Sequence, residues 1–166
     1  MEVVALSNND ILAKLNKYNV PCQFVQYSDV KNVSHINQII PCILLYELHF
    51  PVGHWVALFR NSQGINYFDS TGHYPDELNI TNFDNPKGRK NMGADFTYLV
   101  KLLLDSNETI IYNEIRLQPE DTMTCGYWSG TRLLTQDITN KDFNDVFRRM
   151  SVSNREDKIV KLWNSL

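Results

Sequence analysis

Apolar residues recur along the chain with two spacings, one typical of helices and the other typical of strands. A first helix is predicted to begin near Ser7, because Ser7 or Asn8 can cap it and Asp10 suits the positive end of its dipole. The apolar residues that follow have helical spacing. They are Ile11, Leu12, Leu15 and Tyr18. Pro21 is expected to end this helix, since proline lacks the amide proton that a helix interior needs.

Four short runs rich in β-branched and aromatic residues then predict strands. They are Cys22–Tyr27, Cys42–Leu48, Trp55–Arg60 and Ile65–Asp69. The Asn61-Ser62-Gln63-Gly64 segment between the last two is typical of a tight turn, so these two strands are expected to form a β-hairpin. The polar stretch Ser70–Asn91 is expected to be a long surface excursion, a feature that is often functional in a compact domain.

The C-terminal half has a mostly helical pattern. Helices are predicted over Ala94–Asp105, Cys125–Leu134, Lys141–Met150 and Asn154–Trp163. A β-rich run, Thr109–Ile115, and a loop, Arg116–Thr124, separate the first of these helices from the second. The order of elements predicts an α+β fold, in which helices flank a central mixed or mostly antiparallel sheet.

Composition narrows the possible classes of protein. The chain has 166 residues, 43% hydrophobic and 21% charged, which is typical of one globular domain, so residues 1–166 are expected to form a single domain. A net charge of -3 disfavours general electrostatic binding to nucleic acid or to an anionic membrane. The apolar runs are too short to cross a bilayer, so no membrane partner is expected.

The chain contains three cysteines, Cys22, Cys42 and Cys125, without CxxC spacing. This pattern disfavours a disulfide framework or a zinc site and favours reduced thiols in a reducing compartment. Neither a metal nor a cofactor is expected. Cys22 and Cys42 lie in apolar strands and are expected to fill the core, as buried cysteines commonly do.

The predicted hairpin places a histidine beside a carboxylate. If its loop holds an even number of residues, His54 and Asp69 lie on the same face, either directly opposite or diagonal. A carboxylate there can fix the tautomer and the direction of the imidazole. A three-residue loop would instead put the two side chains on opposite faces. The other histidines, His35, His49 and His73, show no such partner pattern and are expected to be surface or packing residues.

Cys125 is expected at the N-terminus of a helix, where unpaired amide groups and the helix dipole lower the pKa of a thiol. The same amide groups can bind a developing oxyanion. Gly126 would let the backbone approach a substrate, and Gln118 can offer side-chain N–H groups to the oxyanion. Together these residues would supply the nucleophile, base, orienting carboxylate and oxyanion donor of an acyl transfer.

This combination resembles the adenovirus-protease-like cysteine peptidases, which share a clan with the proteases specific for ubiquitin-like proteins. The resemblance rests on Gly53-His54-Trp55-Val56-Ala57-Leu58, Tyr67-Phe68-Asp69-Ser70, Gln118 and Cys125-Gly126, in that order. Six residues separate Gln118 from Cys125, which resembles the adenovirus branch more than the SUMO-protease branch. Similar proteases occur in virophages and Polinton-like elements with icosahedral capsids.

The resemblance implies an adenain-like fold and a role for each matched residue. Cys125 would be the nucleophile, His54 the general base and then the general acid, and Asp69 the residue that orients His54. Gln118 and the backbone N–H of Cys125 would form the oxyanion hole, and Trp55 would pack beside the site.

The resemblance also implies a viral endopeptidase that cleaves capsid or other structural precursor proteins at small-residue, Gly-containing sites during maturation. Such an enzyme would be found in the virion or in the virus factory of the host cytoplasm. The DNA and disulfide-linked peptide activators of the adenovirus enzymes are not expected, because this chain is acidic and neither Cys22 nor Cys42 aligns with the linking cysteine.

Three alternatives use the same fold. The chain could be an isopeptidase that removes ubiquitin or a ubiquitin-like modifier with the same residues. It could be an acyltransferase of the same clan, or a non-catalytic assembly module. The intact set of His54, Asp69 and Cys125 argues against the last of these.

Overall fold

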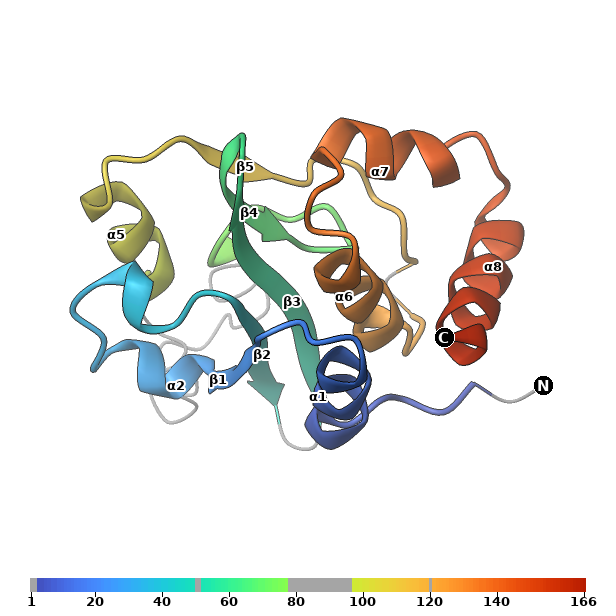
Figure 1. Cartoon of the computed structure of the whole chain (residues 1–166), viewed down its shortest axis with the longest axis horizontal. Helices are drawn as coiled ribbons and strands as arrows, with labels where there is room; N and C mark the ends of the chain where they lie inside the picture. Colours follow the sequence, from blue (N-terminus) through green and yellow to red (C-terminus); the bar gives the residue numbers. More distant parts are fainter. Residues whose placement is uncertain (1–2, 50–51, 78–96, 120) are drawn as a thin grey trace.

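A mixed β-sheet lies at the centre of the molecule (Figure 1). The computed structural model describes residues 3–49, 52–77, 97–119 and 121–166. Within these residues the strands lie side by side in chain order. They are β1 (Gln23–Gln26), β2 (Cys42–His49), β3 (Val52–Asn61), β4 (Gly64–Phe68) and β5 (Ile110–Tyr112). The central pairs β2–β3 and β3–β4 are antiparallel, whereas β1–β2 and β4–β5 are parallel, which confirms a mixed sheet.

Helices cover both faces of this sheet and confirm the α+β class. Figure 1 shows α1, α6, α7 and α8 on one side and α2 and α5 on the other. The helices on the first side are α1 (Asn8–Lys17), α6 (Cys125–Leu134), α7 (Asn140–Phe147) and α8 (Val152–Ser165). Those on the second side are α2 (Tyr27–Val30), the 3-10 turn η1 (Ile36–Gln38) and α5 (Tyr98–Asp105).

Successive residues of a strand point to opposite faces of the sheet, and because helices cover both faces, both sets of side chains are buried. Trp55, Ala57 and Phe59 of β3 pack into the core beneath α1 and α6. Val56 and Leu58 pack into the second core, beneath α2 and α5. Strand β3 is therefore apolar along most of its length, as its sequence indicated.

Three helix boundaries match the sequence prediction closely. Ser7 caps α1 in a capping box, in which its hydroxyl accepts from the Asp10 amide and the Asp10 carboxylate accepts from the Ser7 amide. Helix α6 begins at Cys125 and ends at Leu134, as predicted. The prediction that Cys125 lies at a helix N-terminus is therefore confirmed.

Other boundaries differ from the prediction. The strand predicted over Cys22–Tyr27 is shorter, because Tyr27 begins α2 and its ring stacks on Tyr46, with centroids 4.9 Å apart. Strand β3 begins earlier than predicted, at Val52, and α7 ends at Phe147, three residues before the predicted end. Helix α8 extends beyond both predicted ends, from a Ser151 cap.

The predicted surface excursion is only partly described. Its residues 78–91 lie outside the described residues, as do residues 94–96 of the next predicted helix, whose described part follows Thr97. The described beginning of the excursion is only partly at the surface, because Ser70, Thr71 and Asp76 are buried whereas Tyr74 is exposed. The Asp76 carboxylate accepts from the Tyr46 hydroxyl and from the Val100 amide, and so attaches this loop to α5. Among the described helices, none is long and apolar enough to cross a membrane.

Candidate active site

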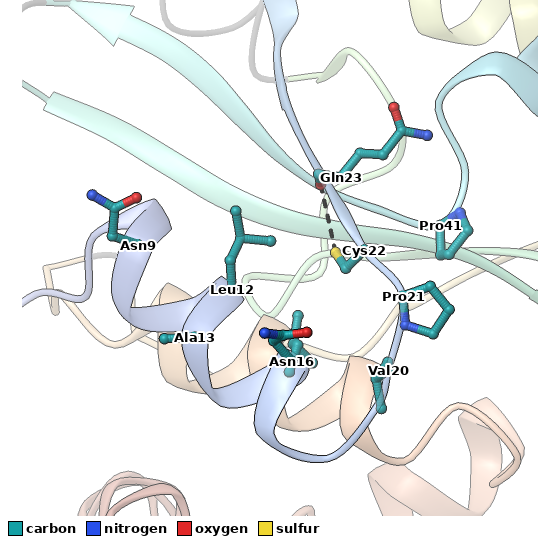
Figure 2. A pocket seen from close by; sticks show the side chains of 10 residues that line it. Asn9, Leu12, Ala13, Asn16, Val20, Pro21, Cys22, Gln23 and Pro41 are labelled. Carbon is teal, nitrogen blue, oxygen red and sulfur yellow. Dashed lines mark hydrogen bonds between the residues drawn. The ribbon is translucent and has the colours of Figure 1, made fainter.

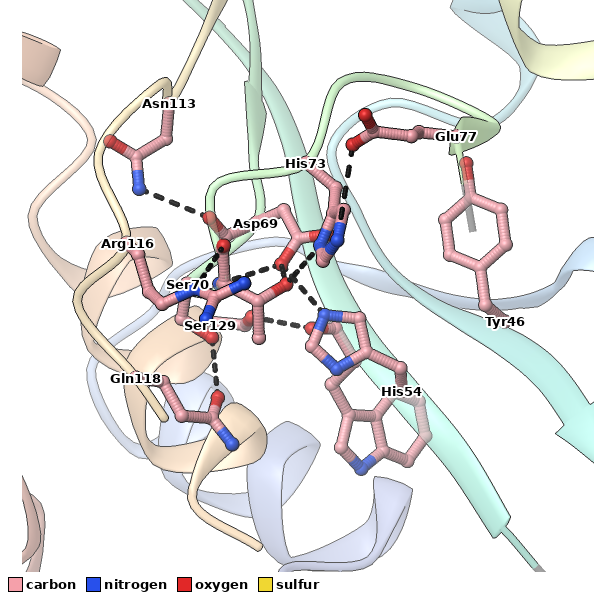
Figure 3. Close-up of polar contacts among 12 residues, drawn as sticks. Tyr46, His54, Asp69, Ser70, His73, Glu77, Asn113, Arg116, Gln118 and Ser129 are labelled. Carbon is pink, nitrogen blue, oxygen red and sulfur yellow. Dashed lines mark hydrogen bonds and ion pairs between the residues drawn. The ribbon is translucent and has the colours of Figure 1, made fainter. Parts of the chain in front are cut away.

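The β3–β4 hairpin brings His54 and Asp69 together. Asn61 pairs with Gly64 across a two-residue turn, so the loop has the even length on which the prediction depended. Continuing the register beyond the last pair, Ala57 with Phe68, places residue 71 opposite His54 and puts Asp69 in the diagonal position. The His54 Nε2 atom lies 2.7 Å from Asp69 Oδ1 (Figure 3).

Asp69 is fully buried, and its carboxylate is held by several donors. Besides the bond to His54, Oδ1 accepts from the Thr71 amide at 2.8 Å and from the Thr71 hydroxyl at 2.6 Å. Burial raises the pKa of Asp69, but the charge and hydrogen bond of His54 and the two bonds from Thr71 outweigh it, so the pKa lies below its ordinary value. Asp69 is therefore a fixed anion behind the imidazole.

The His54 imidazole links Asp69 to the Cys125 thiol. Nε2 is occupied by Asp69, which leaves Nδ1 for the side-chain hydrogen bond with Cys125. Burial lowers the pKa of His54, but the Asp69 charge and the bonds to Asp69 and Cys125 raise it well above the ordinary value. Burial likewise raises the pKa of the Cys125 thiol, yet the His54 hydrogen bond and charge and the Trp55 amide bring it below the ordinary value. These opposite shifts favour a thiolate–imidazolium pair.

The thiol reaches His54 across an open edge of the sheet. Strand β4 ends at Phe68, so the part of β3 before Ala57 has no β4 neighbour. Helix α6 takes that place: the Ser129 hydroxyl donates to the Trp55 carbonyl at 3.1 Å, and the Trp55 amide bonds the Cys125 sulfur. Cys125 and Ser129 lie one helical turn apart, so a single face of α6 pairs with the backbone of Trp55.

The exposed fraction of the side chains decreases from Cys125 through His54 to Asp69. Cys125 retains 9% of its surface exposed and His54 retains 7%, whereas Asp69 has none. The amide groups at the start of α6 remain available, because the N-cap residue Thr124 makes no side-chain capping bond.

Gln118 belongs to the same cluster through the turn that follows β4. The Ser70 carbonyl accepts from the Gln118 amide at 2.9 Å, and the Ser70 hydroxyl donates to Gln118 Oε1 at 2.6 Å (Figure 3). The side-chain oxygen is thereby fixed, and Nε2 donates one proton to the Thr122 carbonyl at 3.0 Å. An amide nitrogen has a second proton, which is the one available to an oxyanion.

Trp55 and Gly126 lie next to the cluster, and both take part in the packing around α6. The Trp55 indole donates to the Leu6 carbonyl at 3.1 Å. A Cβ atom on Gly126 would lie 3.0 Å from Leu6 Cβ and 3.3 Å from both Ile11 and Trp55. The packing of residue 6, α1 and Trp55 against α6 thus leaves little room for a side chain at residue 126.

Sequence reasoning missed several residues that support the triad. Thr71 follows Asp69 by two residues, the spacing of an Asx turn, and this signal was available. His73 was expected to be a surface or packing residue, but its Nδ1 atom lies 2.7 Å from the Thr71 hydroxyl and 4.0 Å from Asp69 Oδ2. Asn113 donates to the Asp69 carbonyl at 3.0 Å, a contact that nothing in the sequence pattern indicates.

A separate cavity of about 810 Å³ lies between α1 and the start of β1 (Figure 2). None of His54, Asp69, Gln118 and Cys125 lines it. Cys22 does, and burial raises the pKa of this thiol to about 12, which makes it a poor nucleophile. In the described part of the chain, no group of three or more histidine, cysteine or acidic side chains is arranged to hold a metal ion.

Comparison with known proteins identifies a viral relative. No protein-family model matches the chain. Uncharacterized protein V9 of the Sputnik virophage is 34% identical to it over 149 residues, which make up 86% of this chain and 82% of the virophage protein. The match agrees with the expected viral origin. The chain belongs to the same family as this virophage protein.

Proposed function

We propose that this chain is a viral cysteine endopeptidase with an adenain-like fold. The single observation that carries the proposal is the contact of the Cys125 thiol with an imidazole whose other nitrogen is held by a buried carboxylate. The order of His54, Asp69, Gln118 and Cys125 along the chain also supports it, since the similar viral proteases have this order. The relative in a virophage supports a role in a virus.

The first half-reaction is acylation of Cys125. The thiolate attacks the carbonyl carbon of the scissile bond, and the carbonyl electrons move to the oxygen. This oxyanion accepts hydrogen bonds from the Cys125 amide and from Gln118 Nε2. The tetrahedral intermediate collapses to a thioester as the C–N bond breaks, and the His54 imidazolium gives its proton to the leaving amine.

The second half-reaction is hydrolysis of the thioester. Neutral His54 takes a proton from a water molecule, whose oxygen attacks the thioester carbonyl. The same donors stabilise the second oxyanion, and its collapse releases the new carboxyl terminus and restores the thiolate beside the imidazolium. Throughout the cycle, Asp69 stays ionised and stabilises the imidazolium form.

The substrates we propose are capsid or other structural precursor proteins of the virus, cleaved during maturation in the virion or in the virus factory. The resemblance to viral maturation proteases and the virophage relative support this choice. An isopeptidase acting on a ubiquitin-like modifier would use the same chemistry, and the test below separates the two.

The test is cleavage of the structural proteins of the parent virus by the purified chain, followed by mass spectrometry of the new N-termini. Wild type and Cys22→Ala should produce the same fragments, and Cys125→Ala should produce none. Equal cleavage by Cys125→Ala would disprove the assignment. Rapid labelling of Cys125 by a vinyl sulfone of a ubiquitin-like protein, without cleavage of structural proteins, would favour the isopeptidase.

A further inference from the structure

Helix α8 reaches the residue that precedes the nucleophile. The Glu156 carboxylate of α8 accepts the Thr124 hydroxyl proton through Oε2 at 2.5 Å and the Trp128 indole proton through Oε1 at 3.3 Å. Both donors belong to the start of α6, and Glu156 is only partly exposed there. A carboxylate is also favoured electrostatically at a helix N-terminus. None of the chemistry described above uses this contact.

The contact determines what the Thr124 hydroxyl does. Threonine at an N-cap commonly accepts a hydrogen bond from an amide two or three residues further on. Here the backbone of Thr124 has φ -97° and ψ 3°, outside the extended region of a capping residue, and its hydroxyl makes no cap. Such a cap would bind the amide of Gly126 or Tyr127, and in the described structure the Thr124 side chain binds neither.

The same contact continues to the second oxyanion donor. The Thr124 hydroxyl lies 3.3 Å from the Thr122 hydroxyl, and the Thr122 carbonyl accepts from Gln118 Nε2 at 3.0 Å. Glu156 therefore supports the loop that carries Gln118 as well as the turn that carries Cys125. One side chain of α8 is linked to both donors that the proposed mechanism requires.

We propose that Glu156 is a positioning residue for the oxyanion hole: by binding the Thr124 hydroxyl it fixes the Thr124–Cys125 peptide unit, whose N–H group is the oxyanion donor beside the nucleophile. This inference rests on the proposed function. Glu156 touches neither the substrate nor the thiol, and it acts through Thr124.

The ionised carboxylate form of Glu156 suits its two hydrogen bonds. Both contacts of Glu156 are donors, so each needs an acceptor oxygen. The neighbouring Arg155 charge favours the anion, whereas burial, the largest influence, and the Asp121 charge raise the pKa of Glu156 above its ordinary value. Replacement by glutamine puts an NH₂ group against one of the two donors, so Glu156→Gln should release either Thr124 or Trp128.

The test compares two reactions of the Cys125 thiol, measured at that residue by mass spectrometry. Iodoacetamide alkylates the sulfur by direct displacement of iodide and forms no oxyanion. p-Nitrophenyl acetate transfers its acetyl group to the sulfur through an oxyanion and releases p-nitrophenolate. Loss of oxyanion stabilisation should therefore slow acylation alone, whereas damage to the thiolate or to the fold should slow both reactions.

Glu156→Gln and Thr124→Val should each lower the acylation rate about 10- to 100-fold, less than the loss of a whole donor, and leave alkylation within about twofold. The double variant should be no slower than either single variant, because both remove the same contact. Thr124→Ser keeps the hydroxyl that Thr124→Val lacks, and it should retain most of the wild-type acylation rate. Asp157→Asn, an exposed change at the next position of α8, is the matched control and should leave both rates unchanged.

Equal acylation by Glu156→Gln and wild type would overturn the inference, as would a parallel loss of both reactions. Additive effects in the double variant would show that Glu156 does not act through Thr124, and would overturn it too. If wild-type Cys125 is alkylated rapidly but not acylated, the proposed function itself fails, and that outcome is distinct from a defect confined to the Glu156 variants.

Discussion

Replacing Asp69 with asparagine tests whether a buried carboxylate sustains the charge of His54. The side chain keeps its shape, and one oxygen can still accept from Nε2, but the negative charge 2.7 Å from that atom is removed. A hydrogen bond to a charged group contributes about 1.5–3 kcal/mol. Loss of the charge should therefore raise the free energy of the imidazolium by about this amount and lower the pKa of His54 towards its ordinary value.

The sign of the pH effect follows from the two shifts in the wild type. The pKa of Cys125 is lowered and that of His54 is raised, and both shifts favour the thiolate–imidazolium ion pair. Protonated His54 stabilises the fold fully below the ordinary histidine pKa, and this contribution is lost as the pH rises through the raised value. In Asp69→Asn the alkaline end of the ion-pair range should move to lower pH. Its acidic end should not rise, because the Asp69 charge raises the pKa of Cys125.

Nitrogen-15 NMR of the histidines reports the alkaline end directly, and the pH dependence of alkylation at Cys125 reports the acidic end. Neither measurement requires a substrate. Asp157→Asn makes the same chemical change on the surface and should shift neither midpoint. A wild-type His54 that titrates near the ordinary value of about 6.5, or an alkaline midpoint that is the same in Asp69→Asn, would refute the reasoning.

Three further outcomes are expected. Gln118→Ala should lower the kcat of proteolysis on the order of 10²–10³-fold while alkylation of Cys125 is unchanged, and an unaltered kcat would contradict its assignment. Gly126→Ala should destabilise the fold by about 1–3 kcal/mol in urea unfolding, because the new methyl group would contact Leu6 at 3.0 Å. Arg132→Lys should lower the free energy of unfolding by about 1.5–3 kcal/mol in the same assay, because the buried guanidinium donates to two backbone carbonyls. An unchanged unfolding midpoint in either the Gly126 or the Arg132 variant would contradict the contacts described for that residue.

Local patterns were sufficient to predict the parts of the fold that depend on neighbouring residues. The cap at Ser7, the turn between β3 and β4 and the start of α6 at Cys125 are all set within a few residues of chain. The proximity of His54 and Asp69 follows from the turn alone, since the register of a hairpin is determined by its loop length. This part of the candidate site could therefore be predicted from the sequence.

Contacts between distant segments could not be predicted in the same way. Tyrosine is common in strands, and Tyr27 was predicted to end one. In the structure Tyr27 is instead the first residue of α2, and its hydroxyl accepts from the distant Tyr98 amide. Glu156 lies in an amphipathic helix, where nothing in the spacing of charges distinguishes it from its exposed neighbours. The importance of such a residue depends on which helix packs beside it, and hydrophobic periodicity does not contain that information.

The open edge of β3 explains how residues from two layers meet at one point. His54 lies on the face of the sheet opposite to α6, as the alternation with Trp55 requires. Had β4 continued beyond Phe68, the amide and carbonyl of Trp55 would have been paired with it, and β4 would have separated the sulfur from the imidazole. Because β4 ends there, these backbone groups need other partners, and α6 provides them through Ser129 and Cys125. The ordinary requirement that buried backbone groups be paired thus positions the Cys125 thiol beside the His54 imidazole.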